Sequence, residues 1–183
     1  MTSPATDLAG LLTSRIRDVP DYPKSGVLFK DIAPLLADAE AFAALTQALA
    51  ERATALGATK VVGLEARGFV LAAPAAFAAG LGFVPIRKKG KLPGEVHAQS
   101  YDLEYGSATL EVQCDAFTPG ERVLVVDDVL ATGGTIGASL DLVRRAGAQL
   151  AGVVVLMELG FLDGRERLAA HLDGAPLETL VVV

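Results

Sequence analysis

The segment from Val123 to Thr135 constrains the fold of this chain more than any other part of the sequence. Its first residues are bulky and apolar, which predicts a buried strand. We expect this strand to end in two adjacent carboxylates, Asp127 and Asp128, and a glycine-containing loop then leads into an amphipathic helix. A strand, a short loop and a helix in this order are half of a βαβ unit, so the segment predicts an α/β fold with a parallel sheet.

Similar patterns along the chain extend this prediction. Short apolar runs predict strands at Lys60–Leu64, Gly82–Arg87, Arg122–Asp127 and Gly152–Glu158. Alanine-rich stretches between them predict helices over Phe42–Leu56 and Phe69–Ala79, and we expect Pro74 to kink the second helix or to delay its start. In the helix after Thr135, apolar residues recur on one face, and Gly147 stands where a helix commonly ends.

A different pattern covers Ser107–Gln113, where apolar and polar residues alternate. This period of two predicts a half-exposed antiparallel strand. We expect its partner near Arg87–Lys91, with Lys91–Gly106 as the mobile tip of a flap. Because no repeat or linker divides the chain, we expect one domain over residues 1–183.

Composition narrows the class of protein. The chain is 51% hydrophobic but only 5% aromatic, so its core must consist of Ala, Val and Leu, which suits strands covered by helices on both faces. A formal net charge of −6 argues against a general nucleic-acid surface. The single cysteine, Cys114, excludes an internal disulfide framework. With no signal-peptide pattern and no apolar stretch of about 20 residues, we expect a cytoplasmic protein without a membrane segment.

The loop after Asp127 and Asp128 indicates the chemistry. Neighbouring like charges are costly unless something binds them, and Thr132-Gly133-Gly134-Thr135 at a helix start can hold an anion through backbone N–H groups. No lysine follows the glycines, which excludes a P-loop. Acids beside an anion cradle predict a ligand with hydroxyls and one phosphate, a ribose 5-phosphate. The alternative is a solvated acidic turn.

Two further strand ends should lie at the same edge of the sheet. Leu64 is followed by Glu65-Ala66-Arg67-Gly68, and another predicted strand ends at Glu158-Leu159. We therefore expect one crevice at the carboxyl ends of three strands.

Several segments of the sequence resemble a known family. Val125–Thr135 is similar to the phosphoribosyl-pyrophosphate signature of the type I phosphoribosyltransferases. Other segments resemble the adenine-specific members of that family, and they extend the resemblance from about Arg15 to Arg167: Asp21–Pro23, Gly26–Ile32, Gly63–Phe69, Pro85–Gly94 and Leu103–Gly106.

The resemblance implies a fold and an activity. The fold would be a central, mostly parallel sheet flanked by helices, with an N-terminal hood at residues 1–36 and a flexible β-flap at about residues 87–113. The activity would be transfer of the 5-phosphoribosyl group from phosphoribosyl pyrophosphate to adenine, giving AMP and pyrophosphate in purine salvage. The resemblance also implies a homodimer, and Mg²⁺ bound through substrate and water without direct protein ligands.

The resemblance implies roles for particular residues as well. Asp127 and Asp128 would hold the ribose hydroxyls, and the 5-phosphate would bind to Ala131, Thr132, Gly133, Gly134 and Thr135. The pyrophosphate would contact Ala66, Arg67, Arg87 and Lys91. Glu104 would exchange a proton with the purine, Tyr105 would close over the ribose, and Arg67 would assist the leaving group. Adenine would lie against Val27, Leu28, Phe29, Lys30 and Leu159.

The residues alone leave several alternative roles and functions open. The basic run Arg87–Lys91 could be a solvated surface, Arg67 a surface arginine, and Phe29 a core residue. The acceptor could be another base, namely xanthine, hypoxanthine, guanine or orotate. A regulator that binds phosphoribosyl pyrophosphate without turnover is the alternative from a different class of protein.

Overall fold

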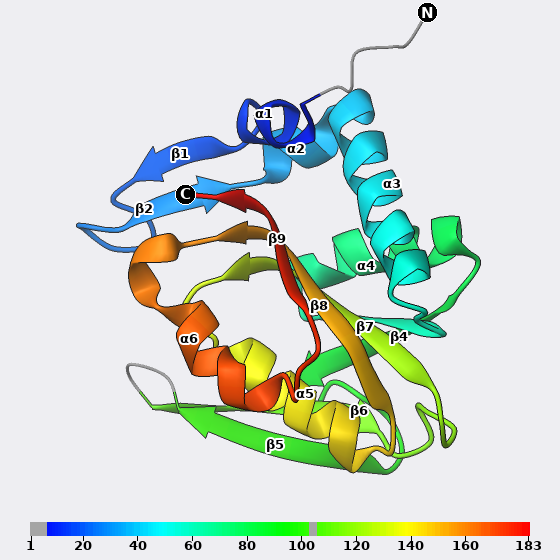
Figure 1. Cartoon of the computed structure of the whole chain (residues 1–183). Helices are drawn as coiled ribbons and strands as arrows, with labels where there is room; N and C mark the ends of the chain where they lie inside the picture. The colour runs from blue at the N-terminus through cyan, green and yellow to red at the C-terminus, as the bar shows by residue number, and fades with distance from the viewer. Residues whose placement is uncertain (1–6, 103–105) are drawn as a thin grey trace, which may run out of the picture. The chain divides into compact units, whose positions relative to one another are not determined.

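The computed structural model describes residues 7–102 and 106–183, which form two compact units (Figure 1). The boundary lies between Ala48 and Leu49, inside helix α3 (Ala39–Ala55). The first unit also contains α1 (Leu8–Thr13), β1 (Arg17–Pro20), β2 (Leu28–Asp31) and α2 (Ala33–Ala37). Its two strands form an antiparallel pair in which Arg17 lies opposite Asp31.

The second unit is built on a sheet of seven strands in the order β5-β6-β4-β3-β7-β8-β9. The strands are β3 (Lys60–Leu64), β4 (Gly82–Lys88), β5 (Val96–Asp102), β6 (Ser107–Gln113), β7 (Arg122–Leu130), β8 (Gln149–Glu158) and β9 (Leu177–Val182). In the part of this order that runs β4-β3-β7-β8-β9, neighbouring strands are parallel. β5 and β6 are antiparallel to each other. The predicted α/β fold with a mostly parallel sheet and flanking helices is confirmed.

The direction of the crossovers reverses between β3 and β7. Helix α4 (Arg67–Ala79) leads from β3 to β4 on one side, and α5 (Gly134–Arg145) leads from β7 to β8 on the other. Right-handed crossovers running in opposite directions place their helices on opposite faces of the sheet. At such a switch point the loops after the two central strands separate and leave a crevice at their carboxyl ends.

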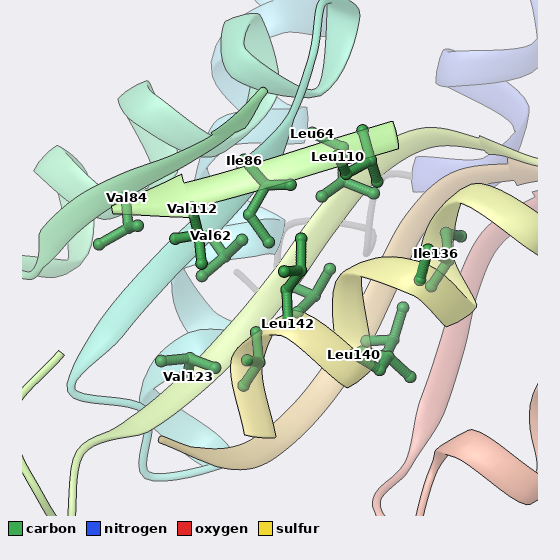
Figure 2. Close-up of a cluster of buried hydrophobic side chains, with 14 of the residues drawn as sticks. Val62, Leu64, Val84, Ile86, Leu110, Val112, Val123, Ile136, Leu140 and Leu142 are labelled. Atoms are coloured by element: carbon green, nitrogen blue, oxygen red, sulfur yellow. The ribbon is translucent and has the colours of Figure 1, made fainter. Parts of the chain in front are cut away.

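The packing of side chains agrees with this arrangement. A Cβ on Gly63 would lie 2.8 Å from the Cβ of Ala72 in α4, so Gly63 faces that helix and permits its close approach. Val62 and Leu64 point to the other face, because side chains alternate along a strand. There they join the buried cluster with Ile136 and Leu140 of α5, as Figure 2 shows.

Most predicted elements occur with shifted ends. The predicted helix with Pro74 begins at Arg67, earlier than expected, and continues through the proline. The carbonyl of Val70 loses its helical donor at Pro74, but Val70 is exposed, so water can bind that carbonyl. Gly147 follows the end of α5 with a φ of +85°, as the sequence predicted.

The antiparallel part of the sheet differs from the prediction. The expected partner of β6 contributes only two residue pairs, Arg87 with Glu111 and Lys88 with Leu110. The principal partner is β5, which lies within the segment Lys91–Gly106 that we expected to be the tip of the flap. Val96–Asp102 has no clear alternation of apolar and polar residues, so its sequence does not indicate a strand. An edge strand does not need this alternation, because its polar residues can remain in water. Across residues 7–102 and 106–183, no helix is both long and apolar enough to cross a lipid bilayer.

Candidate active site

A cavity of about 400 Å³ lies at the switch point, at the carboxyl ends of β3 and β7. One wall is formed by Glu65, Ala66 and Arg67, and the other by Asp127, Asp128 and the loop that precedes α5. The structure therefore brings the predicted ribose and 5-phosphate residues together with two of the predicted pyrophosphate residues, Ala66 and Arg67.

Asp127 and Asp128 are buried residues of the second wall of this cavity. Their exposed fractions are 8% and 4%. They do not end the strand, as we expected, because β7 continues to Leu130 through its pairing with β8. Pairing with β3 stops at Val126, so the edge of β7 beyond Val126 faces the crevice. The carboxylates thus lie inside a strand that is paired on one side only at this point.

Burial is the main reason why both carboxylates resist ionisation. It raises the pKa of Asp127 well above the ordinary value, and repulsion from Asp128 adds to the effect. Burial also raises the pKa of Asp128, where the positive charge of Arg67 opposes it. The Nη2 of Arg67 lies 2.9 Å from Oδ2 of Asp128. This ion pair makes a negative charge easier to hold on Asp128 than on Asp127.

One carboxylate oxygen keeps capacity for a ligand. Among the described residues, Oδ2 of Asp128 is buried and accepts no hydrogen bond of good geometry, although it pairs by charge with Arg67. By contrast, Oδ1 of Asp127 accepts the backbone N–H of Asp128 at 2.9 Å. A buried acceptor without a donor is costly, so Asp128 suits a ligand that brings hydroxyl protons.

The loop before α5 has the geometry of an anion cradle. Residues 131–133 form a bend, and Gly133 has a φ of +85°, in the left-handed region that favours glycine. A Cβ on Gly133 would also lie 2.9 Å from the carbonyl oxygen of Gly164, so a side chain has no room there. No side chain of the described residues caps the start of α5. Its first backbone N–H groups can therefore bind a phosphate.

The opposite wall is held close to the acids by a glycine. A Cβ on Gly68 would lie 2.7 Å from Oδ1 of Asp127 and 3.0 Å from the carbonyl oxygen of Val126. The first turn of α4 therefore contacts β7 directly. This contact brings Arg67 to Asp128, and Ala66 lies beside it after a cis Glu65–Ala66 peptide bond.

Arg87 and Lys91 lie next to the cavity and do not line it. The Arg87 guanidinium contacts Oε2 of Glu65 at 3.3 Å and donates to the carbonyl of Lys91 at 3.0 Å. Burial alone would raise the pKa of Glu65, but the Lys88 backbone N–H and the Arg87 guanidinium hold it below the ordinary value. Lys88 is the member of this basic run that lines the cavity. The sequence pattern could not distinguish it from its neighbours.

Leu159 follows β8, and its N–H donates to the carbonyl of Leu130 at 2.9 Å. It does not line the cavity described above. The preceding residue, Glu158, is only 8% exposed and binds Arg165 through several hydrogen bonds, the shortest 2.6 Å long. Thr179 of β9 donates to the same carboxylate at 2.8 Å. These contacts fix the turn that carries Leu159 against the end of the sheet.

We expect Arg165→Met to lower the free energy of unfolding by about 1–3 kcal/mol at pH 7, because it leaves a buried carboxylate without its cation. The loss should stay below that of a fully buried pair, since the Arg165 side chain is 47% exposed. Arg165 is the main cause that lowers the pKa of Glu158. A lowered pKa stabilises the fold above the unfolded value, so the difference from wild type should shrink as the pH falls below about 4.

Urea unfolding at several pH values measures this difference. Adding Glu158→Gln to the variant removes the uncompensated charge and should restore part of the stability. A double variant that is no more stable than Arg165→Met at pH 7 would contradict the explanation.

The predicted adenine residues of the hood belong to the first unit. Leu28, Phe29 and Lys30 lie on β2, and Val27 directly precedes them. The rings of Phe29 and Tyr22 pack edge to face, with 5.1 Å between their centroids. The Lys30 ammonium lies 2.7 Å from Oδ1 of Asp18. The predicted catalytic residues Glu104 and Tyr105 lie outside the described residues.

The fold and the cavity define an α/β protein that binds a phosphate-bearing ligand at the switch point of its sheet. Known proteins similar to this chain belong to such a class. The model of the phosphoribosyl transferase domain family matches residues 35–174. The chain therefore belongs to the phosphoribosyltransferase family, and the implied type I fold is confirmed.

Within the family, the chain is similar to adenine phosphoribosyltransferases. One from Streptomyces coelicolor is 68% identical, and the match covers 100% of both chains. The crystal structure of one from Rhodothermus marinus has a TM-score of 0.89 and 48% identity, covering 98% of this chain and 99% of that chain. One from Saccharomyces cerevisiae, complexed with an imino-altritol bisphosphate and adenine, has a TM-score of 0.87 and 39% identity, covering 94% and 98%.

Proposed function

We propose that this chain transfers the 5-phosphoribosyl group from phosphoribosyl pyrophosphate to adenine, giving AMP and pyrophosphate. One observation carries the proposal: the crevice between β3 and β7 joins buried acids, an anion cradle and an arginine in a single cavity. The choice of adenine is supported by relatives that carry the name of this activity, one of them 68% identical.

In this reaction C1 of the ribose exchanges one bond for another. The bond to the pyrophosphate oxygen breaks, and its electron pair leaves with pyrophosphate. A purine nitrogen forms the new bond and gives up its proton. Positive charge develops on the sugar, so Asp127 and Asp128 would both hold the ribose hydroxyls and stabilise the cationic transition state.

The other residues of the cavity would hold the two phosphate ends of the donor. The 5-phosphate would bind the loop Ala131–Thr135 at the start of α5, where backbone N–H groups point to an anion. Ala66 and Arg67 would receive the pyrophosphate, with a guanidinium that can bind two phosphate oxygens at once. Arg87 and Lys91 belong to the same proposal as nearby cations that offset the negative charge of the donor.

Binding and deprotonation of adenine would depend on residues other than those described as lining this cavity. The hood residues Val27–Lys30 and Leu159 would enclose the adenine ring. Glu104 would take the purine proton, because a carboxylate that loses water on closure of the flap becomes more basic. Tyr105 would cover the ribose and keep out water that could hydrolyse the sugar.

Magnesium is part of the same proposal. No group of three or more His, Cys, Asp or Glu side chains within the described residues could hold a metal ion. Mg²⁺ usually keeps several waters and binds through one or two carboxylates and substrate phosphates. We propose that Mg²⁺ binds here through the substrate and water without direct protein ligands, and the spare acceptor on Asp128 could receive a hydrogen bond from such a water. When bound, Mg²⁺ would neutralise charge on the diphosphate.

We also propose a cytoplasmic homodimer. Val70 and Phe77 are 44% and 88% exposed, and their spacing places them on one face of α4. Every residue of this helix after Arg67 is glycine, proline or apolar, and such a surface favours contact with another protein. A single cysteine without a disulfide suits a reducing compartment. Sedimentation equilibrium measures the oligomeric state.

The activity is tested by incubating the protein with phosphoribosyl pyrophosphate, Mg²⁺ and one base at a time. We expect AMP and pyrophosphate with adenine, little product with hypoxanthine, guanine, xanthine or orotate, and no transfer in excess chelator. Turnover of xanthine but not adenine would contradict the proposed acceptor. Tight binding of phosphoribosyl pyrophosphate without turnover of any base would favour the regulator.

A further inference from the structure

Tyr101 connects the antiparallel part of the sheet to the anion cradle. It lies on β5, where it pairs with Ala108 of β6, and it packs against the buried cluster that includes residues of α5. Its hydroxyl lies 3.1 Å from Oγ1 of Thr135, in the first turn of α5. Both residues line the cavity. No sequence pattern indicates a role for Tyr101, because the surrounding strand is polar and has no diagnostic motif.

The direction of this hydrogen bond matters for the cradle. Thr135 donates to the phenol oxygen, so the proton of the Tyr101 hydroxyl stays available for another acceptor. A phosphate in the cradle offers strong acceptors and no donors when it is fully ionised. Thr135 can donate to the phosphate only if its hydroxyl group rotates so that the proton points away from Tyr101 and towards the phosphate. The phenol can then donate to the threonine oxygen and hold it in that orientation.

We propose that Tyr101 is a positioning residue that orients the Thr135 hydroxyl towards the 5-phosphate of the sugar ligand. This inference rests on the proposed function, since that function places the 5-phosphate on residues 131–135. Two hydroxyls in series polarise each other, so the threonine becomes a better donor to an anion than an isolated hydroxyl would be. The rigid tyrosine ring, packed on the core, limits the orientations that Thr135 can adopt.

Tyr101→Phe tests the inference, because it keeps the ring and removes only the hydroxyl. Loss of one hydrogen bond that supports a charged ligand should raise the KM for phosphoribosyl pyrophosphate about tenfold. The KM for adenine should stay within about twofold of wild type. Thermal stability should also stay close to wild type, because packing of the ring on the cluster is retained.

A matched control lies next to Tyr101 on the same strand. The Ser100 hydroxyl is 3.0 Å from Oγ1 of Thr109 on β6, so Ser100→Ala also removes one hydroxyl hydrogen bond from β5. Ser100→Ala should leave both KM values unchanged. An equal effect of the two variants would mean that β5 is merely weakened, and it would overturn the inference.

A second measurement does not depend on turnover. Titration calorimetry with ribose 5-phosphate should give about tenfold weaker binding to Tyr101→Phe than to wild type, and it remains informative if no base is a substrate. Thr135→Val should weaken the same binding, and Tyr101→Phe should then have no further effect, because the two hydroxyls act as one unit. Fully additive effects of the two substitutions, or unchanged binding to Tyr101→Phe, would overturn the proposed role.

Discussion

Asp127→Asn is expected to reduce transfer by at least about 100-fold and to stabilise the ligand-free protein at pH 7. Activity falls because the amide removes negative charge beside the developing positive charge of the sugar. Stability rises because folding no longer has to bury this carboxylate, whose pKa is raised well above the ordinary value by burial and by Asp128. We expect a gain of about 0.5–2 kcal/mol. For a chain of this length each kcal/mol corresponds to a rise of about 2–4 °C in Tm.

The gain should depend on pH in one direction only. A carboxyl group with a raised pKa in the folded state loses its proton first in the unfolded state, so wild-type stability decreases as the pH rises above about 4. The advantage of Asp127→Asn should therefore disappear at low pH. Asp128→Asn is the matched control: its stability gain should be smaller, because Arg67 already compensates the charge of Asp128. An Asp127→Asn protein that is less stable than wild type at pH 7 would contradict this account.

Gly133→Ala should raise the KM for phosphoribosyl pyrophosphate by about 100-fold, a cost of about 2.7 kcal/mol in binding. The added Cβ must occupy a left-handed backbone position and lies 2.9 Å from the carbonyl oxygen of Gly164. We expect the loop to relieve this contact by moving away from α6 (Gly164–Leu168), which displaces the N–H groups of the cradle. Steady-state kinetics with each substrate varied in turn measures the effect.

Gly147→Ala provides the control for backbone strain. Gly147 has the same φ of +85°, but nothing lies within 4 Å of the position of its Cβ. Both variants should lose about 1–2 kcal/mol of stability from the left-handed conformation. Only Gly133→Ala should weaken binding of the donor. A similar KM in the two variants would mean that the contact with Gly164 does not shape the cradle.

The parallel core could be predicted because each of its strands is a compact apolar run. β3, β7 and β8 are buried on both faces, so their residues need no polar alternation, and β4 is buried on one face and half-buried on the other. β5 and β9 were missed for the opposite reason. They lie at the two edges of the sheet, and polar residues such as Gln99 and Glu178 remain compatible with an edge strand.

Part of the cavity lining could be predicted from the motifs, but the contacts between its residues could not. The motif around Asp127 and Asp128 predicted acids beside an anion-binding loop, and in the structure the acids and this loop line the same cavity. The ion pair between Arg67 and Asp128 depends on the register of β3 against β7 and on the close approach of Gly68. These are long-range properties of the fold, so local sequence patterns contain no signal for them. Tyr101 was missed for the same reason.

The pairing of Arg67 with Asp128 has a consequence for a catalytic cycle. Before any substrate arrives, the guanidinium already has an anionic partner 2.9 Å away, so the resting site contains a neutralised pair. In the proposed reaction, an incoming diphosphate competes for Arg67 while the ribose hydroxyls satisfy Asp128. Filling the site is therefore an exchange of partners. When pyrophosphate departs, the internal pair can form again, which favours product release and resets the enzyme for the next turnover.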